Sequence, residues 1–404
     1  MSFSDGWGPV LLKKRADTIR EHLTKMDLKA LVVTEGMNTA YVTGILPGTT
    51  FYPNWERPGA TVIPLDGEPF TIQNELIGYG IRLALERKRA WITDVRLWQE
   101  HPRLTNRLHI RRELGLMLSE GLKERGITKG QVGVDAASLV LHNLIAPYLP
   151  NVECVNASSI LREMRMVKCE EELRLIRKAG ELSDWAQKKY QESASVGKRI
   201  YALDAEIAHV LAIETTEKYP EYHIGVSSHT IGFGPYSWAG GPGGYKGTKI
   251  ERGHTLNNAI SVRLNGYGVE NERTMVVGQP SEKQRKIFNV ATEAQKKGVS
   301  KCVEGNRVSD IDAASQEVIE KAGYGEYITH RAGHGIGLGG HEHWDDMAYD
   351  HMKMKEGMVT SVEPAIYIYL DSGYRHSDTV IIGKREPEPV TKYSKELENL
   401  IIAV

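Results

Sequence analysis

The sequence predicts an α/β domain over residues 1–164, followed by an α+β domain over residues 165–404 that contains a pseudo-twofold repeat. Helix and strand signals alternate through the first part of the chain, which is typical of an α/β layer. A long amphipathic helix then interrupts this alternation. After it, the order helix, helix, strands occurs twice. We therefore expect two domains, each with its own hydrophobic core.

Four short segments support the N-terminal domain. Apolar residues at helical spacing predict a helix across 19–26, and ALVVT (30–34) has the composition of a strand. ATVIPLDGEPFTI (60–72) contains two β-rich runs around an Asp-Gly pair, which predicts a hairpin. KGQVGVDAASL (129–139) again reads as a strand that leads into a helix.

The end of the alternating helix and strand signals predicts a domain boundary near 160–168. Beyond it, Leu175, Ala179, Leu182 and Ala186 form one apolar stripe of a helix. Further helices are expected at 203–218, 281–303 and 308–322, and β-segments at 258–264 and 270–278. The glycine-rich stretch 232–247 lacks the GxxxxGK[ST] pattern of a phosphate-binding loop, so we interpret it as a flexible loop.

Composition limits the function. Lys plus Arg (51) nearly cancels Asp plus Glu (52), which argues against a nucleic-acid partner. The chain starts without the pattern of a signal peptide, and no apolar run approaches the roughly 20 residues that span a bilayer. Three separated cysteines, Cys154, Cys169 and Cys302, fit a reducing compartment. We expect a cytoplasmic enzyme without a membrane partner.

Four motifs carry a resemblance to a known family. They are GYGVENERT (266–274), GHGIGLGGHE (333–342), KEGMVTSVEPAIY (355–367) and GYRHSDTVIIG (373–383). Together they resemble the pita-bread peptidase and creatinase family, which includes aminopeptidase P and prolidase, and MRMVKCEEELRLIRKA (164–179) resembles the first helix of its catalytic domain. The resemblance implies the pita-bread fold for the C-terminal domain and a hydrolase that cleaves carbon–nitrogen bonds.

The metallopeptidases of this family bind two divalent ions through five side chains. Carried over by position, these ligands fall on Ala259, Glu270, His334, Glu363 and Ser377. Two carboxylates are missing, and hard dications require several anionic oxygens. We therefore expect no dinuclear centre, and our first interpretation is an enzyme without a metal.

Creatinase is the member of the family that works without metal, and its pattern fits in part. The resemblance assigns Glu272 and Glu363 to the cationic nitrogen end of a small substrate. It also assigns Trp55 and Arg57 to the active site of a neighbouring subunit, which implies a homodimer. Creatinase's second carboxylate-binding arginine falls on Asp345, and its catalytic histidine falls in PYSWAGGPGG, which contains no histidine. A more cationic substrate than creatine would suit these residues.

The catalytic imidazole is left open among three histidines. His334 lies in the strongest motif, His341 matches the histidine that the peptidases point at the reacting bond, and His376 stands beside the lost ligand at Ser377. Each could instead be structural. Glu272 and Glu363 complete the predicted catalytic set, and further substrate contacts are predicted for Trp55, Arg57, Tyr267, Glu270, Asp345 and Arg375. Tyr267 could simply pack, and Arg375 could brace Glu363 or Glu272.

The leading interpretation is a homodimeric, creatinase-like hydrolase that cleaves a C–N bond of a small amidine, guanidine or amide without a metal. One alternative is a metal-dependent Xaa-Pro peptidase or a lyase with one divalent ion at Glu270, His334 and Glu363. Another is an inactive domain kept as a binding module. Metal analysis of the purified protein separates the first two.

Overall fold

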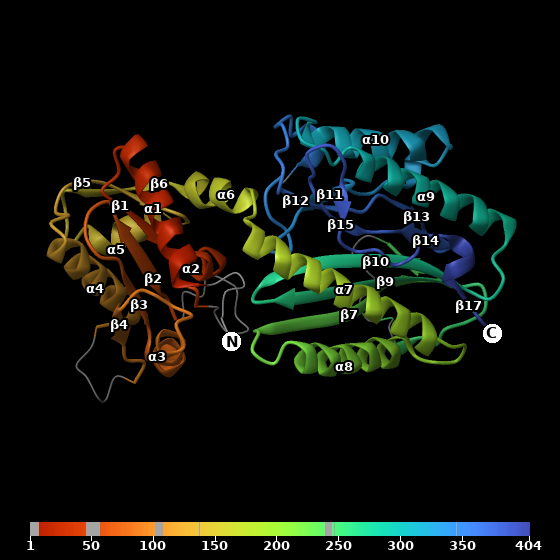
Figure 1. Cartoon of the computed structure of the whole chain (residues 1–404), viewed down its shortest axis with the longest axis horizontal. Helices are drawn as coiled ribbons and strands as arrows, with labels where there is room; N and C mark the ends of the chain where they lie inside the picture. The colour runs from red at the N-terminus through yellow and green to blue at the C-terminus, as the bar shows by residue number, and fades with distance from the viewer. Residues whose placement is uncertain are drawn as a thin grey trace. The chain divides into compact units, whose positions relative to one another are not determined.

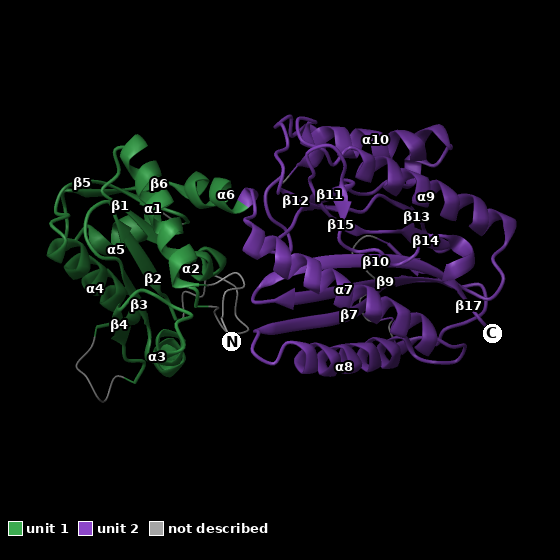
Figure 2. Ribbon diagram, viewed as in Figure 1, with its two compact units in different colours: residues 1–165 green, residues 166–404 purple. Residues whose placement is uncertain are grey.

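The computed structural model describes residues 8–45, 57–101, 108–136, 138–238, 245, 247–344 and 346–404. The chain forms two compact units, Met1–Arg165 and Met166–Val404 (Figure 2).

Unit 1 contains a six-stranded mixed sheet with the order β4-β3-β2-β1-β5-β6 (Figure 1). Its strands are β1 (Ala30–Val33), β2 (Ala60–Pro64), β3 (Phe70–Asn74), β4 (Asp94–Trp98), β5 (Gly130–Val134) and β6 (Val152–Asn156). Its helices are α1 (Pro9–Lys25), α2 (Gly36–Thr43), α3 (Gly78–Glu86), α4 (Ile110–Glu124), α5 (Ser138–Ile145) and α6 (Ser158–Met166). The expected hairpin is the antiparallel pair β2–β3.

Unit 2 begins with two helices on a five-stranded sheet. The helices are α7 (Glu170–Ser193) and α8 (Ile200–Lys218), and the sheet has the order β17-β10-β9-β7-β8. Its strands are β7 (Ile224–Phe233), β8 (Tyr236–Ser237), β9 (Thr255–Leu264), β10 (Tyr267–Val277) and β17 (Ile401–Ile402). The apolar stripe expected from 175 to 186 is buried on α7, which packs against β9 and β10.

The second half of unit 2 repeats this arrangement. Helices α9 (Glu282–Ser300) and α10 (Val308–Lys321) lie beside strands of two small sheets (Figure 1). The larger sheet has the order β11-β12-β15-β16, and the smaller one is β13-β14. Their strands are β11 (Gly333–Gly335), β12 (Val359–Val362), β13 (Ala365–Ile368), β14 (Ser372–Arg375), β15 (Asp378–Ile381) and β16 (Glu388–Pro389). The predicted fold class is confirmed.

The β9–β10 hairpin determines which residues reach the site. Asn265 and Gly266 connect the two strands, and both have positive φ (48° and 87°). A two-residue Asn-Gly turn matches the right-handed twist of the strands and fixes their register. As a result, Glu272 lies directly opposite Ala259, and Glu270 lies opposite Ser261.

Candidate active site

Strand β10 presents two carboxylates on one face. Side chains two residues apart on a strand point to the same side, so Glu270 and Glu272 project together and Asn271 projects to the other side. The amide of Asn271 donates to Ser183 and Asp184 on α7. These hydrogen bonds show that the face of β10 with Asn271 is covered by α7. Both glutamates therefore project from the face of β10 that points away from α7.

His334 on β11 meets these carboxylates. Its Nε2 lies 3.1 Å from Glu270 Oε2 and 3.4 Å from Glu363 Oε1. Its Nδ1 lies 3.0 Å from the carbonyl oxygen of Gly335, which can only accept a hydrogen bond. The Nδ1 atom therefore carries a proton, and in neutral His334 the Nε2 lone pair faces two carboxylates.

Three electron-rich groups that converge in this way require a cation between them. Burial lowers the pKa of His334, but the contact with Glu270 and the charge of Glu363 outweigh burial and raise it to about 9. A proton on Nε2 can supply the missing positive charge, and so can a metal ion that displaces this proton. Glu270 Oε2 and His334 Nε2 are both buried, yet among the described residues neither has a partner at hydrogen-bond geometry. These residues fit one divalent ion with nitrogen and oxygen ligands.

His341 lies against His334. The potential ligand atoms of Glu270, His334 and His341 are all within 4.8 Å of one another. However, the two imidazole rings are stacked, with centroids 3.7 Å apart and an interplanar angle of 13°. A histidine holds a metal in the plane of its ring, and two nearly parallel planes at this separation do not share an ion. In this arrangement Glu363, rather than His341, is the better third ligand.

The stacking leaves His341 available for proton transfer. Its Nδ1 lies 3.3 Å from Nη2 of Arg331, which can only donate, so neutral His341 carries its proton on Nε2. Burial and the charge of His334 lower the pKa of His341. A neutral imidazole with its N–H at Nε2, next to the carboxylate cluster, can donate a hydrogen bond or a proton to a bound substrate.

Arg375 at the end of β14 neutralises the other side of the cluster. Its guanidinium forms an ion pair with Glu272, and its Nη1 lies 4.0 Å from Glu363 Oε2. Burial raises the pKa of Glu272, Arg375 opposes this rise, and the charge of Glu363 adds to it. Tyr367 also interacts with the arginine. Glu363 therefore faces His334 with one oxygen and Arg375 with the other.

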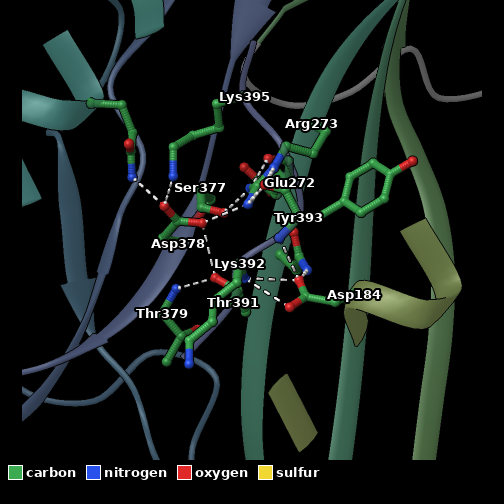
Figure 3. A network of polar contacts seen from close by, with 12 residues as sticks. Asp184, Glu272, Arg273, Ser377, Asp378, Thr379, Thr391, Lys392, Tyr393 and Lys395 are labelled. Atoms are coloured by element: carbon green, nitrogen blue, oxygen red, sulfur yellow. Dashed lines mark hydrogen bonds and ion pairs between the residues drawn. The ribbon is translucent and has the colours of Figure 1, made fainter. Parts of the chain in front are cut away.

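A buried polar network holds the backbone behind the cluster (Figure 3). Arg273 donates to the carbonyl oxygens of Glu272 and Ser377 at 2.7 and 2.8 Å, and to Asp378 Oδ1 at 2.7 Å. Lys395 forms a second ion pair with Asp378. Burial raises the pKa of Asp378, but Arg273 and Lys395 outweigh this and lower it to about 2. The network joins β10 to β15 and to the C-terminal segment.

The structure does not bring His376 to this cluster. Arg375 and Ser377 face the cluster, and the intervening His376 points to the other side of the chain. Its ring is fully buried and lies edge-on to Phe288 on α9, with centroids 4.9 Å apart. Tyr267 also turns away, because its hydroxyl donates to Glu172 on α7. Its position agrees with the packing role that was left open.

The remaining predicted contacts are those of Arg57, Trp55 and Asp345. Arg57 makes a bidentate ion pair with Glu100, at 2.9 and 3.1 Å, within unit 1. Trp55 and Asp345 lie outside the described residues. Their roles, like that of Arg57 across a subunit interface, remain predictions.

Sequence reasoning missed the ion pair that supports the loop carrying His341. The side chains of Lys168 and Glu342 are both buried, with 3.3 Å between Nζ and Oε2. The other oxygen of Glu342 accepts from the backbone N–H of Gly339 at 2.6 Å. The signals were a lysine just before the amphipathic helix and a glutamate beside His341. Their pairing required knowledge of the fold.

Models of two protein families match most of the chain. The model of metallopeptidase family M24 matches residues 174–384, and that of the creatinase/prolidase N-terminal domain matches residues 15–167. The chain belongs to metallopeptidase family M24. Because a peptidase breaks the C–N bond of a peptide, the expected class, a hydrolase of carbon–nitrogen bonds, is confirmed.

Individual relatives extend over most of the chain. An Xaa-Pro dipeptidase of Pyrococcus furiosus is 27% identical over 390 residues, covering 96% of this chain and 100% of that protein. One from Pyrococcus horikoshii is 33% identical over 246 residues, covering 61% of this chain and 68% of that protein. The solved structure of dipeptidase PepE from Mycobacterium ulcerans has a TM-score of 0.79 at 25% identity, covering 98% and 99% of the two chains.

The expectation of an enzyme without a metal is wrong. It is overturned by membership of a metallopeptidase family and by the cluster around Glu270 and His334, whose potential ligand atoms lie close enough together to hold a metal ion. The metal-free, creatinase-like subtype is also unsupported, since the relatives reported above are dipeptidases. The missing carboxylates did not justify the expectation, because a site that has lost two of its five ligands can still bind one ion.

A search of the described residues for membrane-spanning helices finds none with the required length and hydrophobicity.

Proposed function

We propose that this protein is a metal-dependent dipeptidase that cleaves Xaa-Pro peptides with a single divalent ion. The observation that carries the proposal is the convergence of the carboxylates of Glu270 and Glu363 on Nε2 of His334. A divalent ion bound there would polarise the scissile carbonyl as a Lewis acid. The names of the relatives supply the substrate class.

The protein's own groups have separate tasks in this proposal. Glu270, His334 and Glu363 hold the ion. His341 donates from Nε2 to the substrate, because Arg331 keeps its Nδ1 occupied. Glu272 Oε2 and Arg375 Nε are buried without hydrogen-bond partners among the described residues, so both have unused hydrogen-bonding capacity next to the proposed ion.

The test is proline release from Xaa-Pro dipeptides by protein stripped of metal and then reloaded with Mn²⁺, Co²⁺ or Zn²⁺. We expect no activity without metal and activity after reloading. A matched His334→Ala variant should lose both metal and activity, whereas a His209→Ala variant, altered at an exposed histidine on α8, should keep both. Hydrolysis of a guanidine compound such as creatine, but of no dipeptide, would contradict the proposal.

The homodimer and the cytoplasmic location also remain proposals. In the single chain Arg57 is occupied by Glu100, so a role in a neighbour's site requires this pair to open. Sedimentation equilibrium tests the dimer directly. If the chain is a dimer and Arg57→Ala raises KM without changing the association state, Arg57 acts on substrate. If the protein is a monomer with full activity, that role is excluded.

A further inference from the structure

Glu363 stands between two cation positions. Its Oε1 lies 3.4 Å from His334 Nε2, on the side of the proposed metal ion, and its Oε2 lies 4.0 Å from Nη1 of Arg375. A carboxylate that faces one positive group with each oxygen is the arrangement of a bridging ligand in a two-metal site. Here a guanidinium occupies the second side.

Arg375 is held firmly at that position. Its side chain is 12% exposed, and its ion pair with Glu272 involves a carboxylate that is only 3% exposed. Two charges buried together keep each other in place, because removing either one leaves the other without compensation.

The strand register explains why Glu272 reaches this point. Glu272 lies directly opposite Ala259 on β9, and it forms an isolated antiparallel bridge with Ser377 on its other side. Directly opposed residues share a face of the sheet, with Cβ atoms about 5 Å apart. Ala259 and Ser377 are the two positions where the family pattern of metal ligands is broken. The carboxylate of Glu272 therefore projects between the two positions that lack one.

We propose that the Arg375–Glu272 pair replaces the second metal ion, so that the chain binds one divalent ion and carries its second cation as a side chain. This inference rests on the proposed metal site at Glu270, His334 and Glu363. It accounts for the charge of the cluster. Arg375 cancels Glu272, and the remaining carboxylates, Glu270 and Glu363, balance one dication.

The test counts Mn²⁺ ions per chain by isothermal titration and by elemental analysis after dialysis. The unaltered protein should bind one ion even at saturating Mn²⁺. Arg375→Met frees Glu272 and Glu363 for a second, weaker ion, so the count should rise to two. Arg331→Met, which removes the arginine next to His341, should leave the count at one. The electron paramagnetic resonance spectrum gives a second reading, because two neighbouring Mn²⁺ ions couple and a single ion does not.

A second variant keeps the inference testable if Arg375→Met does not fold. Arg375→Met combined with Glu272→Gln removes both charges of the pair, and it should fold and bind one ion. Two ions in the unaltered protein, one ion in folded Arg375→Met, or two in the double variant would each overturn the inference. No bound ion in the unaltered protein would instead refute the proposed metal site. Because the count uses no substrate, it does not depend on whether the substrate is an Xaa-Pro peptide.

Discussion

At the scale of single residues, hydrogen-bond donors and acceptors decide which group does what. The carbonyl oxygen of Gly335 and the guanidinium of Arg331 set opposite tautomers for two stacked histidines. In its neutral form His334 has a lone pair on Nε2, whereas neutral His341 has a proton there. The first suits a metal ligand and the second suits a proton donor.

This division predicts separate effects of two substitutions. His341→Asn should lower kcat by roughly 100-fold, the lower end for loss of a general acid or base, with bound Mn²⁺ unchanged. His334→Asn should instead abolish Mn²⁺ binding. Steady-state kinetics and elemental analysis of both variants check this. Loss of the ion from His341→Asn would show that His341 is a ligand after all.

Asp378 gives a prediction about stability and pH. Its ordinary pKa of 3.8 is lowered to about 2 in the folded chain, so the folded state favours the ionised form. The stability that follows is present above pH 4 and is lost as the pH falls through about 2. This corresponds to about 2 kcal/mol. The difference in unfolding free energy between the unaltered protein and Asp378→Asn should shrink by this amount between pH 4 and pH 2.

Urea denaturation at several pH values measures that difference. Asp17→Asn, altered at an exposed carboxylate on α1, serves as the control and should show no comparable change. A difference between the unaltered protein and Asp378→Asn that stays constant down to pH 2 would contradict the assigned role of Arg273 and Lys395.

At the scale of elements, the loop over residues 337–344 contains two residues with a strained backbone conformation. His343 and Trp344 have φ angles of 51° and 48°, in the left-handed region that residues other than glycine rarely adopt. Such residues persist only where their surroundings hold them. The buried pair of Lys168 and Glu342 and the buried indole of Trp344 supply that support.

Removal of Lys168 tests this support. Lys168→Met leaves Glu342 as a buried charge without its ammonium partner, which should lower the free energy of unfolding by about 3–5 kcal/mol. Lys168→Met with Glu342→Gln should cost clearly less than the sum of the two single changes. A double-mutant cycle by chemical denaturation measures the coupling. A cycle without coupling would show that the pair does not act as a unit.

Elements with strong local patterns were predictable, and their contacts were not. The stripe from Leu175 to Ala186 predicted α7 because a helix places those residues on one side. The Asn-Gly pair at 265–266 is a further turn signal, and in the structure it determines the hairpin between β9 and β10. The orientation of His376 could not be predicted, because the sequence does not show which side of this segment faces the cluster and which side faces α9. In the structure its ring lies against Phe288 on α9.

At the scale of the whole molecule, the proposed ligands all lie in unit 2. Glu270, His334 and Glu363 are far apart in the sequence but are joined by β10, β11 and the end of β12. The five-ligand pattern showed what was missing. It could not show that Glu272 projects between the missing positions, since this follows from the register of β9 and β10.

Binding of an ion should therefore stabilise one unit selectively. At an ion concentration 100 times Kd, unit 2 should gain about 2.7 kcal/mol. Hydrogen–deuterium exchange should slow in β10, β11 and β12 when Mn²⁺ is added, and it should not change in β1 and β5 of unit 1. Equal protection in both units would place the ion, or its effect, outside the proposed cluster.

Diffraction at the absorption edge of bound manganese tests the central claim most directly. The account predicts a single anomalous peak per chain, about 2 Å from His334 Nε2 and from carboxylate oxygens of Glu270 and Glu363, with none beside Arg375. Two peaks bridged by Glu363, or a peak that leaves His334 without contact, would contradict it.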